Sequence, residues 1–343
     1  MELEGHVTVP MDNNLKARVV AQYRGKYRVK NGADEYWAEV TGKMMFNASS
    51  PSDYPVVGDL VGIIDAGGGD AVIEMIEPRK NLIQRKAAGK DGAQPIASNV
   101  DTAFIVEAAD RDFNLNRFER YLAITASQKI SPVLVLNKTD LIGPVQLEEL
   151  KAALSERFKE TPFITTSLYS PDGLDMLKEK LVPGCVHCFL GSSGVGKSSL
   201  INKLLGEELI KTKEISSQTN KGKHTTTHRE LYVLENGAML IDNPGMREIG
   251  LTGISAAVDG LFDGISSLSS GCRFPDCTHT SEPGCAVLKA VSEGSISRGQ
   301  YDNYLKLKKE SEHYAMTDSE RKRRDKSIGK LVKGFYKVNP KKR

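Results

Sequence analysis

Residues 191–198 read GSSGVGKS and match the phosphate-binding pattern G-x-x-x-x-G-K-[ST] in full. The apolar run CVHCFL at residues 185–190 is suited to a buried strand that leads into this loop. SSLINKLLG then starts a helix at Ser198. The inner face of this helix is made of Leu200, Ile201, Leu204 and Leu205. A chance glycine-rich turn would lack this order of strand, loop and helix, so the chain is predicted to contain a nucleotide-binding α/β domain.

The residue types in the loop suit the phosphates of a nucleotide. Glycines permit a tight turn and a close approach of the backbone to phosphate oxygens, while backbone N–H groups and the following helix N-terminus supply donors and partial positive charge. Lys197 is placed for the β- and γ-phosphates, and Ser198 for Mg²⁺. The nucleotide-contacting residues predicted here are Gly191, Ser192, Ser193, Gly194, Val195, Gly196, Lys197, Ser198 and Ser199.

Asn137, Lys138, Thr139 and Asp140 form the tetrad NKTD, the Asn-Lys-x-Asp signature that GTPases share at the guanine base. The tetrad follows SPVLVL (131–136), a predicted buried strand, and therefore lies at the edge of the sheet where open α/β folds bind ligands. By resemblance, Asp140 accepts two hydrogen bonds from guanine, Asn137 contacts its O6 edge and Lys138 lies along its plane. Adenine would leave Asp140 unpaired. The alternative is an Asn-Lys turn that caps a helix.

The order of these two motifs is unusual. In Ras-like GTPases the P-loop comes first and the tetrad comes last, whereas here the tetrad precedes the P-loop by about fifty residues. Both motifs are intact, which argues against degeneration. The sequence therefore predicts a circularly permuted GTPase domain.

Further GTPase elements follow in the permuted order. TTSLYSPDGL resembles the loop that buttresses the base, with Ser167 at the usual serine position, although an ordinary strand-to-helix loop would look similar. KGKHTTTHREL (221–231) resembles switch I, in which a threonine binds Mg²⁺. Thr226 is the first choice for that role, with Thr225 and Thr227 as alternatives.

The segment LYVLENGAMLIDNPG (231–245) is interpreted as a hairpin followed by switch II. Asn236-Gly237 is a strong signal for a two-residue turn. Asp242 begins the DxxG sequence DNPG at a strand end, where it would reach Mg²⁺ through water. Gly245 would give its N–H to the γ-phosphate.

The residue directly after DNPG differs from that of Ras-like enzymes. Those enzymes place a glutamine there to orient the attacking water, but this chain has Met246, whose thioether cannot do so. Intrinsic hydrolysis is therefore expected to be slow unless another group completes the site. His224 is the candidate, because a neutral imidazole can position or deprotonate water. A surface histidine in a mobile loop is the alternative. Catalytic roles are also assigned to Lys197 and Thr226.

Composition limits the class of protein. The chain has 343 residues, which favours two or three domains, and its apolar and charged fractions are those of a soluble globular protein. No apolar run approaches the length of a membrane span, and MELEGHVTVP at the N-terminus lacks a signal-peptide core. A cytoplasmic protein without membrane association is therefore expected. Thiols there are normally reduced, so the five cysteines do not indicate disulfides.

Three cysteines and a histidine form the pattern C-x4-C-x-H-x5-C, namely Cys272, Cys277, His279 and Cys285. Thiolate and imidazole ligands together suit tetrahedral Zn²⁺, and a full set of protein ligands indicates a structural site. The surrounding segment is rich in turn formers, which need such a metal because they cannot build a core. Unrelated free cysteines are the alternative. The two cysteines of CVHCFL are interpreted as core thiols, because strand residues three apart do not converge.

About ninety residues at the N-terminus have a different character. Short β-branched and aromatic runs such as KARVVAQYRGKYRVKN and DLVGIIDA are punctuated by Gly, Asn and Pro, which predicts a small barrel of the OB or SH3 type. OB barrels commonly bind nucleic acid through one strand face and its loops. A barrel with solvated charges is the alternative. The candidate surface residues are Tyr23, Arg24, Lys26, Tyr27, Arg28 and Lys43.

The centre and the end of the chain complete the pattern. The centre is predicted to be α/β, with a strand at 102–109 and amphipathic helices at 116–129 and 146–160. Residues 321–343 hold eleven Lys and Arg against one acidic residue, whereas the whole chain has a net charge of +3. A basic tail on an acidic body indicates a polyanion partner, and RNA is the natural choice beside an OB-like barrel. A solvated tail without a partner is the alternative.

The barrel, the permuted motifs NKTD, GSSGVGKS, HTTT and DNPG, the C-x4-C-x-H-x5-C cluster and the basic tail closely resemble the RsgA-type GTPases of bacteria over nearly the whole chain. The resemblance implies a GTP hydrolase that binds the 30S ribosomal subunit and its 16S rRNA, assists late maturation of the subunit, hydrolyses GTP when the subunit stimulates it, and then leaves. It also implies GTP and GDP as ligands, Mg²⁺ with GTP, one structural Zn²⁺ per chain, and a monomer.

The expected fold is multidomain. It comprises an all-β OB-like barrel at 1–94, a circularly permuted α/β P-loop GTPase domain at 95–250, and a zinc-binding segment with a helical basic tail at 251–343. Asn243 replaces the usual Thr or Ser and Lys223 replaces the usual Arg, but neither is expected to affect nucleotide binding. A non-catalytic, guanine-nucleotide-gated RNA-binding module and an ATP-dependent enzyme are the alternative functions, and NKTD argues against the second.

Overall fold

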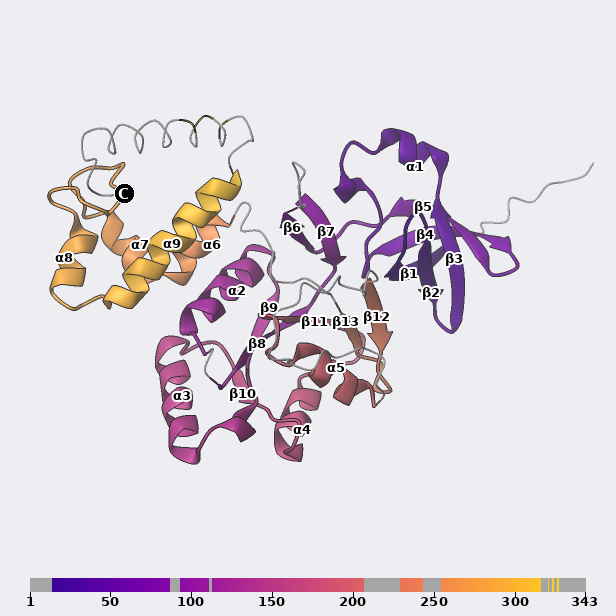
Figure 1. Ribbon diagram of the computed structural model, residues 1–343. Helices are drawn as coiled ribbons and strands as arrows, with labels where there is room; N and C mark the ends of the chain where they lie inside the picture. The colour runs from indigo at the N-terminus through magenta and orange to yellow at the C-terminus, as the bar shows by residue number, and fades with distance from the viewer. Residues whose placement is uncertain are drawn as a thin grey trace, which may run out of the picture.

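The computed structural model describes residues 14–86, 93–110, 113–206, 229–242 and 254–315, together with Glu320, Arg323 and Lys326. In chain order these residues form an N-terminal barrel, a central α/β domain and a C-terminal group of helices (Figure 1). This architecture confirms the predicted fold class. The domain limits placed after residues 94 and 250 stay predictions.

Five strands close into the N-terminal barrel in the order β1-β2-β3-β5-β4, and β4 pairs back onto β1. They are β1 (Asn14–Gln22), β2 (Tyr27–Asn31), β3 (Asp34–Val40), β4 (Leu60–Gly67) and β5 (Asp70–Ile76). β3 and β5 are parallel, whereas the other neighbouring strands are antiparallel. Helix α1 (Gly42–Asn47) and a 3-10 turn (Pro51–Asp53) connect β3 to β4. The OB-like barrel is therefore confirmed.

Strand alternation decides which barrel residues face its core. In β2, Tyr27 and Val29 are buried, at 5% and 0% exposure, while Arg28 and Lys30 alternate with them toward solvent. The prediction that Tyr27 belongs to the nucleic-acid-binding surface is therefore wrong. The two-residue period of the strand turns its ring into the apolar interior.

Six strands form the sheet of the central domain in the order β10-β9-β8-β11-β13-β12. They are β8 (Thr102–Ala108), β9 (Ser131–Asn137), β10 (Phe163–Thr165), β11 (Val186–Leu190), β12 (Arg229–Val233) and β13 (Met239–Asp242). β12 runs antiparallel to β13, whereas the other neighbours in this sheet are parallel. The helices of this domain are α2 (Leu115–Ser127), α3 (Pro144–Arg157), α4 (Pro171–Glu179) and α5 (Lys197–Leu205).

Two apolar layers hold these helices onto the sheet. On one face, Phe118 and Leu122 of α2 and Leu154 of α3 pack with alternate residues of β8, β9 and β11. On the other face, Leu177 of α4 and Leu200 of α5 pack with the intervening residues of the same strands. Strands buried on both faces explain why their sequences are almost wholly apolar. The two helices predicted in the centre of the chain are thus confirmed.

The hairpin of β12 and β13 is confirmed, but its turn differs from the expected one. The Leu234 N–H donates to the Ala238 carbonyl at 2.8 Å, so the loop between them has three residues instead of two. Gly237 ends this loop with a φ of 82°. The two-residue turn is therefore wrong, because Gly237 takes the left-handed position that closes a three-residue hairpin loop.

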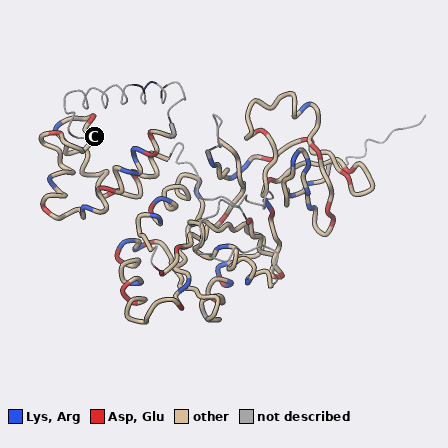
Figure 2. The backbone as a smooth tube through the Cα atoms, in the orientation of Figure 1, with Lys and Arg blue, Asp and Glu red and all other residues tan. Residues whose placement is uncertain are grey.

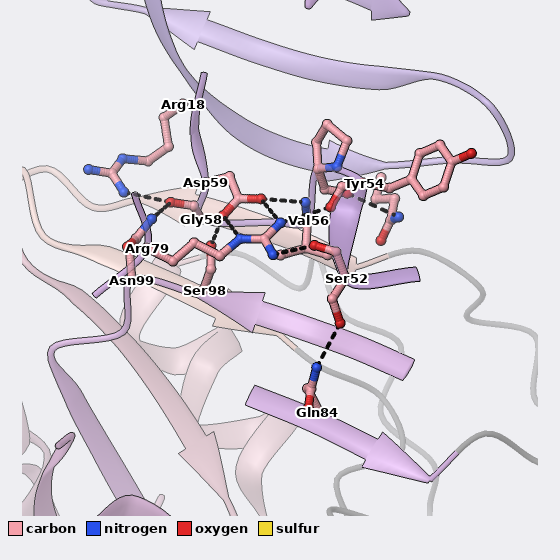
Figure 3. A network of polar contacts seen from close by, with 12 residues as sticks. Arg18, Ser52, Tyr54, Val56, Gly58, Asp59, Arg79, Gln84, Ser98 and Asn99 are labelled. Atoms are coloured by element: carbon pink, nitrogen blue, oxygen red, sulfur yellow. Dashed lines mark hydrogen bonds and ion pairs between the residues drawn. The ribbon is translucent and has the colours of Figure 1, made fainter. Parts of the chain in front are cut away.

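A second hairpin, β6 (Leu82–Lys86) with β7 (Ala93–Ser98), lies between the barrel and the central domain (Figure 1). A buried carboxylate fixes the barrel to it. The fully buried Asp59 accepts hydrogen bonds from Nε and Nη2 of Arg79 at 2.8 and 2.7 Å, from Oγ of Ser98 at 2.5 Å and from the Val56 N–H at 2.8 Å (Figure 3). Donors from three segments therefore surround one buried charge.

The neighbouring backbone is equally constrained. Gly58 has a φ of 97°, and a Cβ at this position would lie 2.2 Å from the carbonyl oxygen of Ser98. Nη1 and Nη2 of Arg79 also donate to the carbonyls of Ser52 and Tyr54, at 2.6 and 2.8 Å. The barrel loop and the start of the central domain therefore meet without room for a larger side chain.

The barrel and the central sheet also join edge to edge. β1 pairs antiparallel with β12, with Ala21 opposite Glu230 and Gln22 opposite Arg229, so that eleven strands form one continuous sheet. Nη1 of Arg229 donates to Oε1 of Gln22 at 3.2 Å and to the Pro95 carbonyl at 2.8 Å. Burial lowers the pKa of Arg229 to about 10, so the guanidinium stays charged at neutral pH. The segment with the predicted switch I therefore leads into a strand that contacts the barrel.

The C-terminal helices are α6 (Ser255–Leu261), α7 (Asp263–Ser269), α8 (Ala286–Ser292) and α9 (Arg298–Ala315). They dock on α2 through polar contacts as well as apolar ones. Glu119 of α2, which is 4% exposed, accepts from Arg157 of α3 and from Asn303 of α9, and Arg120 pairs with Glu310 at 2.8 Å. Among the described residues, no helix is long and apolar enough to cross a membrane. Of the basic tail, only Arg323 and Lys326 are among the described residues.

Candidate nucleotide-binding site and metal centre

The predicted P-loop joins β11 to α5 at the carboxyl edge of the central sheet. All five residues of β11 are buried, and this strand lies between β8 and β13. α5 starts at Lys197 directly after Gly196, so the N–H groups of its first turn face the loop. The predicted phosphate site therefore sits at the centre of the sheet, where open α/β folds place their ligands.

Contacts explain two of the loop glycines. A Cβ on Gly191 would lie 2.2 Å from the Val106 carbonyl oxygen, and a Cβ on Gly196 would lie 2.3 Å from Nδ2 of Asn137. Both glycines have a positive φ, as does Gly194, which has no such neighbour within 4 Å. The first two positions exclude a side chain by contact, and the third favours glycine through its backbone conformation alone.

Asn137 links the tetrad to the P-loop. Its side chain is 1% exposed, and its Nδ2 donates to the Val195 carbonyl at 2.8 Å. Its Oδ1 accepts from Oγ1 of Thr166 at 2.9 Å. The residue thus ties the base loop, the phosphate loop and the loop after β10 together. Its predicted contact with the O6 edge of guanine stays a prediction.

Asp140 is exposed at the same edge and is oriented by a serine. Oγ of Ser167 donates to Oδ1 of Asp140 at 2.6 Å, and the Tyr169 N–H donates to the same hydroxyl oxygen at 3.1 Å. Lys138 adopts a left-handed conformation, with its Nζ 3.7 Å from Oδ2 of Asp110. The structure therefore brings the tetrad and Ser167 together in one loop cluster, as the sequence predicts.

Lys197 and Asp242 converge on the phosphate side of the site. Nζ of Lys197 donates to the carbonyls of Gly191 and Ser192 at 2.8 and 2.6 Å. Burial raises the pKa of Asp242 to about 6; the charge of Lys197 lowers it and that of Glu230 raises it. Asp242 and the Ser198 hydroxyl offer the hard oxygen ligands that Mg²⁺ prefers. These residues fit a magnesium–triphosphate site.

Part of the predicted site lies outside the described residues. His224, Thr225, Thr226, Thr227, Gly245 and Met246 belong to that part of the chain. Their assigned contacts to water, Mg²⁺ and the γ-phosphate stay predictions.

The four predicted metal ligands come together in the C-terminal unit. The ligand atoms of Cys272, Cys277, His279 and Cys285 all lie within 4.8 Å of one another. Sγ of Cys272 is 3.8 Å from Sγ of Cys285, and Nδ1 of His279 is 3.6 and 3.5 Å from these two sulfurs. A tetrahedron of Zn–S bonds has edges of about 3.8 Å. The spacing therefore fits one tetrahedral metal ion.

Surrounding groups hold these ligands in place. Cys285 caps α8 and accepts the Leu288 N–H at 3.4 Å, while Nε2 of His279 lies 3.1 Å from the Ser269 hydroxyl. The Tyr301 hydroxyl donates to the His279 carbonyl at 2.6 Å, which supports the left-handed backbone of that residue. Such outer contacts orient metal ligands. The interpretation of the two cysteines of the predicted P-loop strand as core thiols holds for Cys188, which is buried and whose pKa burial raises to about 12. Cys185 lies just before β11 and is only half-buried, because the strand begins at Val186.

Comparison with known proteins decides the family. The family model described as RsgA GTPase matches residues 76–252. A protein of Lactiplantibacillus plantarum named Small ribosomal subunit biogenesis GTPase RsgA 2 is 41% identical over 89% of this chain and 86% of its own length. The chain belongs to the RsgA GTPase family. It is therefore a GTP hydrolase, and the resemblance predicted from the permuted motifs is confirmed.

Other members and solved structures agree with this assignment. An RsgA of Methanosarcina acetivorans is 46% identical over 74% of this chain and 69% of its own length. The crystal structure of YjeQ from Thermotoga maritima has a TM-score of 0.66 and 26% identity, covering 87% of this chain and 98% of the other. The structure of YloQ, described as a circularly permuted GTPase, has a TM-score of 0.63 and covers 92% of this chain. At 23% identity it supports the permuted fold.

Three residues that support the nucleotide site of this RsgA GTPase are not predicted from the sequence. Thr166 bonds Asn137, the Tyr121 hydroxyl bonds the Ser192 side chain, and Glu230 lies opposite Asp242 on β12. Thr166 directly precedes Ser167 and was within reach of the loop motif. Tyr121 has the spacing of an ordinary core residue on α2, and Glu230 has that of an ordinary strand residue. No local pattern marks a contact made across the sheet.

Proposed function

We propose that this RsgA GTPase binds the 30S ribosomal subunit, assists its late maturation, and leaves after GTP hydrolysis that the subunit stimulates. One observation carries the proposal: relatives named small ribosomal subunit biogenesis GTPases match far more than the GTPase domain. One from Listeria monocytogenes is 40% identical over 95% of this chain. The barrel and the cysteine cluster therefore belong to the shared architecture. The proposed RNA partner is 16S rRNA, and the proposed protein is a cytoplasmic monomer.

The proposed nucleotide contacts follow the geometry of the loops. Asp140, oriented by Ser167, reads guanine; Lys197 and the P-loop amides bind the phosphates. Mg²⁺ is assigned to Ser198 and Thr226, with Asp242 reached through water. When bound, this ion neutralises charge on the phosphates.

The metal of the cysteine cluster is proposed to be one Zn²⁺, because three thiolates and one imidazole with tetrahedral spacing suit that ion. A structural ion here would hold the turn-rich segment between α7 and α8 against α9. It would therefore present the C-terminal helices as a rigid surface, and its chemical role would end there.

The proposed coupling follows from the permutation. Switch I leads into β12, which pairs with the barrel, and switch II leads toward the C-terminal helices. A change at the γ-phosphate would therefore reach both appendages through the chain itself, a recognised type of switch. Met246 cannot orient water, so His224 or a group of the subunit is proposed to do so.

The test is GTP turnover measured with added 30S or 50S subunits. We expect strong stimulation by 30S and little by 50S. Turnover that ignores both subunits would contradict the proposal. Single-turnover hydrolysis separates it from the alternative, a nucleotide-gated RNA-binding module, because that module would bind 30S in the GTP state without hydrolysis.

The basic tail provides a second arm of this test. Deleting residues 321–343 removes eleven Lys and Arg and no nucleotide motif. We expect weaker 30S co-sedimentation and a flatter dependence of log affinity on log salt, with intrinsic hydrolysis retained. Equal affinity and slope for both proteins would identify a passive tail and leave the barrel as the main RNA contact.

A further inference from the structure

We propose that the barrel carries a stacking site for an unpaired base of single-stranded RNA, formed by Trp37, Tyr23 and Arg28. This inference rests on the proposed function, in which RNA of the small subunit is the partner, and it names the surface and its chemistry. Trp37 is the chain's only tryptophan, and 46% of its surface is exposed. Aromatic side chains are enriched in binding interfaces relative to the rest of a protein surface. An exposed tryptophan is therefore a candidate contact for a binding partner.

The three side chains form a connected group. Trp37 lies on β3 directly opposite Arg28 of β2. Its ring centroid is 5.2 Å from that of Tyr23, with 51° between the planes, and the guanidinium carbon of Arg28 is 5.9 Å from it. The side chains of Tyr23 and Arg28 are also hydrogen-bonded. Aromatic rings with an adjacent planar cation are what single-strand binders use to hold a base, because every base offers a π-face.

Arg28 is held in place from two sides. Glu35 of β3 pairs with it on the barrel, and Glu230 of β12 lies 3.9 Å from it on the central sheet. A guanidinium fixed beforehand loses less conformational entropy when a base or phosphate binds. Glu230 belongs to β12, the strand that follows the predicted switch I. The stacking site formed by Trp37, Tyr23 and Arg28 therefore also contacts the strand through which the proposed nucleotide-dependent change would pass.

The charge around the stacking site favours RNA over a protein partner. Residues 14–31, which span β1, β2 and their turn, contain six basic residues and no acidic one (Figure 2). Arg24 and Lys26 lie in the turn next to Tyr23, where the phosphates beside a stacked base would pass. β3 itself carries Asp34, Glu35 and Glu39. Two of these acids are paired with basic residues of the β1–β2 segment: Glu35 with Arg28, and Glu39 with Lys26 at 3.1 Å. Basic residues gathered beside exposed rings fit a polyanion with bases.

A single tryptophan makes the site directly observable. The full-length protein, saturated with a non-hydrolysable GTP analogue, is titrated with a short oligouridylate while Trp37 fluorescence is recorded. We expect saturable quenching, because a stacked base quenches the indole. The absence of quenching at oligonucleotide concentrations that saturate binding by anisotropy would overturn the proposal.

Three variants separate stacking from other effects, with affinity read from the anisotropy of a labelled oligouridylate. Trp37→Leu should weaken binding about tenfold, and Trp37→Phe should retain most of it, because only the second keeps a ring. The loss in Trp37→Leu should be the same at every salt concentration, since stacking releases no counterions. Phe46→Ala, at a 90% exposed aromatic residue on α1, is the matched control and should bind normally.

The outcomes distinguish this site from the proposed function. If Trp37→Leu binds oligouridylate like the unchanged protein while 30S still stimulates turnover, the stacking site is wrong and the function stands. If quenching occurs but no subunit stimulates turnover, the site stands and the function falls. If Trp37→Leu loses only 30S binding, the surface docks a ribosomal protein and the proposal is overturned.

Discussion

The Ser167 hydroxyl donates a 2.6 Å hydrogen bond to Oδ1 of Asp140. Asp140 is exposed, so this bond fixes its carboxylate before any base arrives. Because the Tyr169 N–H in turn donates to the Ser167 oxygen, the orientation of the acid is set by the backbone of the loop after β10. The proposed recognition of the base therefore depends on two loops that are separate in the sequence.

Asp140→Asn should shift the base preference from guanine toward xanthine. The substitution replaces the acceptor of the guanine N1–H and N2–H₂ donors with a side chain that also carries a donor. Competition of GTP and XTP against a fluorescent nucleotide measures the shift. Ser167→Ala is the control, and it should weaken GTP binding without favouring XTP. Unchanged GTP affinity in Asp140→Asn would refute the guanine site.

Lys197→Ala should abolish GTP turnover and greatly weaken nucleotide binding, because it removes the charge that faces the phosphates. Ser198→Ala should abolish turnover through loss of the Mg²⁺ contact. His224→Ala should instead leave GTP binding intact and lower the 30S-stimulated rate. Rapid-quench hydrolysis and equilibrium binding separate these effects. A stimulated rate unaffected by His224→Ala would assign the positioning of water to the subunit.

Cys277→Ala should remove the metal from the C-terminal unit. We expect one Zn²⁺ per chain in the unchanged protein and almost none in the variant, because three remaining ligands lose the closed tetrahedral set. Elemental analysis gives the ratio, and proteolysis reports destabilised C-terminal helices. Cys185→Ala, in the segment leading into β11, is the matched control and should keep the metal. Full zinc occupancy in Cys277→Ala would rule out the assignment.

Asp59→Asn should destabilise the junction between the barrel and the central domain by about 3 kcal/mol, because it leaves Arg79, whose side chain is only 15% exposed, without its partner charge. Urea unfolding followed by Trp37 fluorescence reports on the barrel side. Asp65→Asn is the matched control: Asp65 is exposed on β4 and accepts from the Gly67 N–H, so its loss should cost little. Equal effects of the two substitutions would show that the network adds nothing.

His187 should make the protein less stable as the pH falls below about 6.5. This side chain is fully buried on β11, and burial lowers its pKa. As the pH falls, the unfolded chain therefore binds the proton before the folded protein does. This lowers the free energy of unfolding by up to about 1.4 kcal/mol for each unit by which folding lowers the pKa of His187. The loss of stability starts near the pKa of histidine in the unfolded chain and levels off below the pKa of His187 in the folded protein. His187→Gln should reduce the difference in Tm between pH 7.5 and 5.5; an unchanged difference would assign it to other groups.

Local chemistry explains which features could be predicted from sequence. GSSGVGKS and NKTD specify backbone positions and donors over a few residues, so their place at the edge of the sheet follows from the flanking apolar strands. The cysteine spacing predicts the cluster for the same reason. Tyr27 shows the limit: its residue type suits a binding surface, but the register of β2 is set by pairing with β1 and β3. The contact of Gln22 with Arg229 spans 207 positions and has no local signal.

The bond from Asn137 to Val195 has a consequence for how the protein is made. Its two residues are 58 positions apart, with the base-reading half first. A chain that grows at 5–20 residues per second exposes that half about 3–12 s before the phosphate loop. During this interval β8 has no β11 beside it, and Gly196 is not there to close over the asparagine amide. A nascent chain of this permuted kind therefore cannot capture GTP until its barrel and its base loop have already been synthesised.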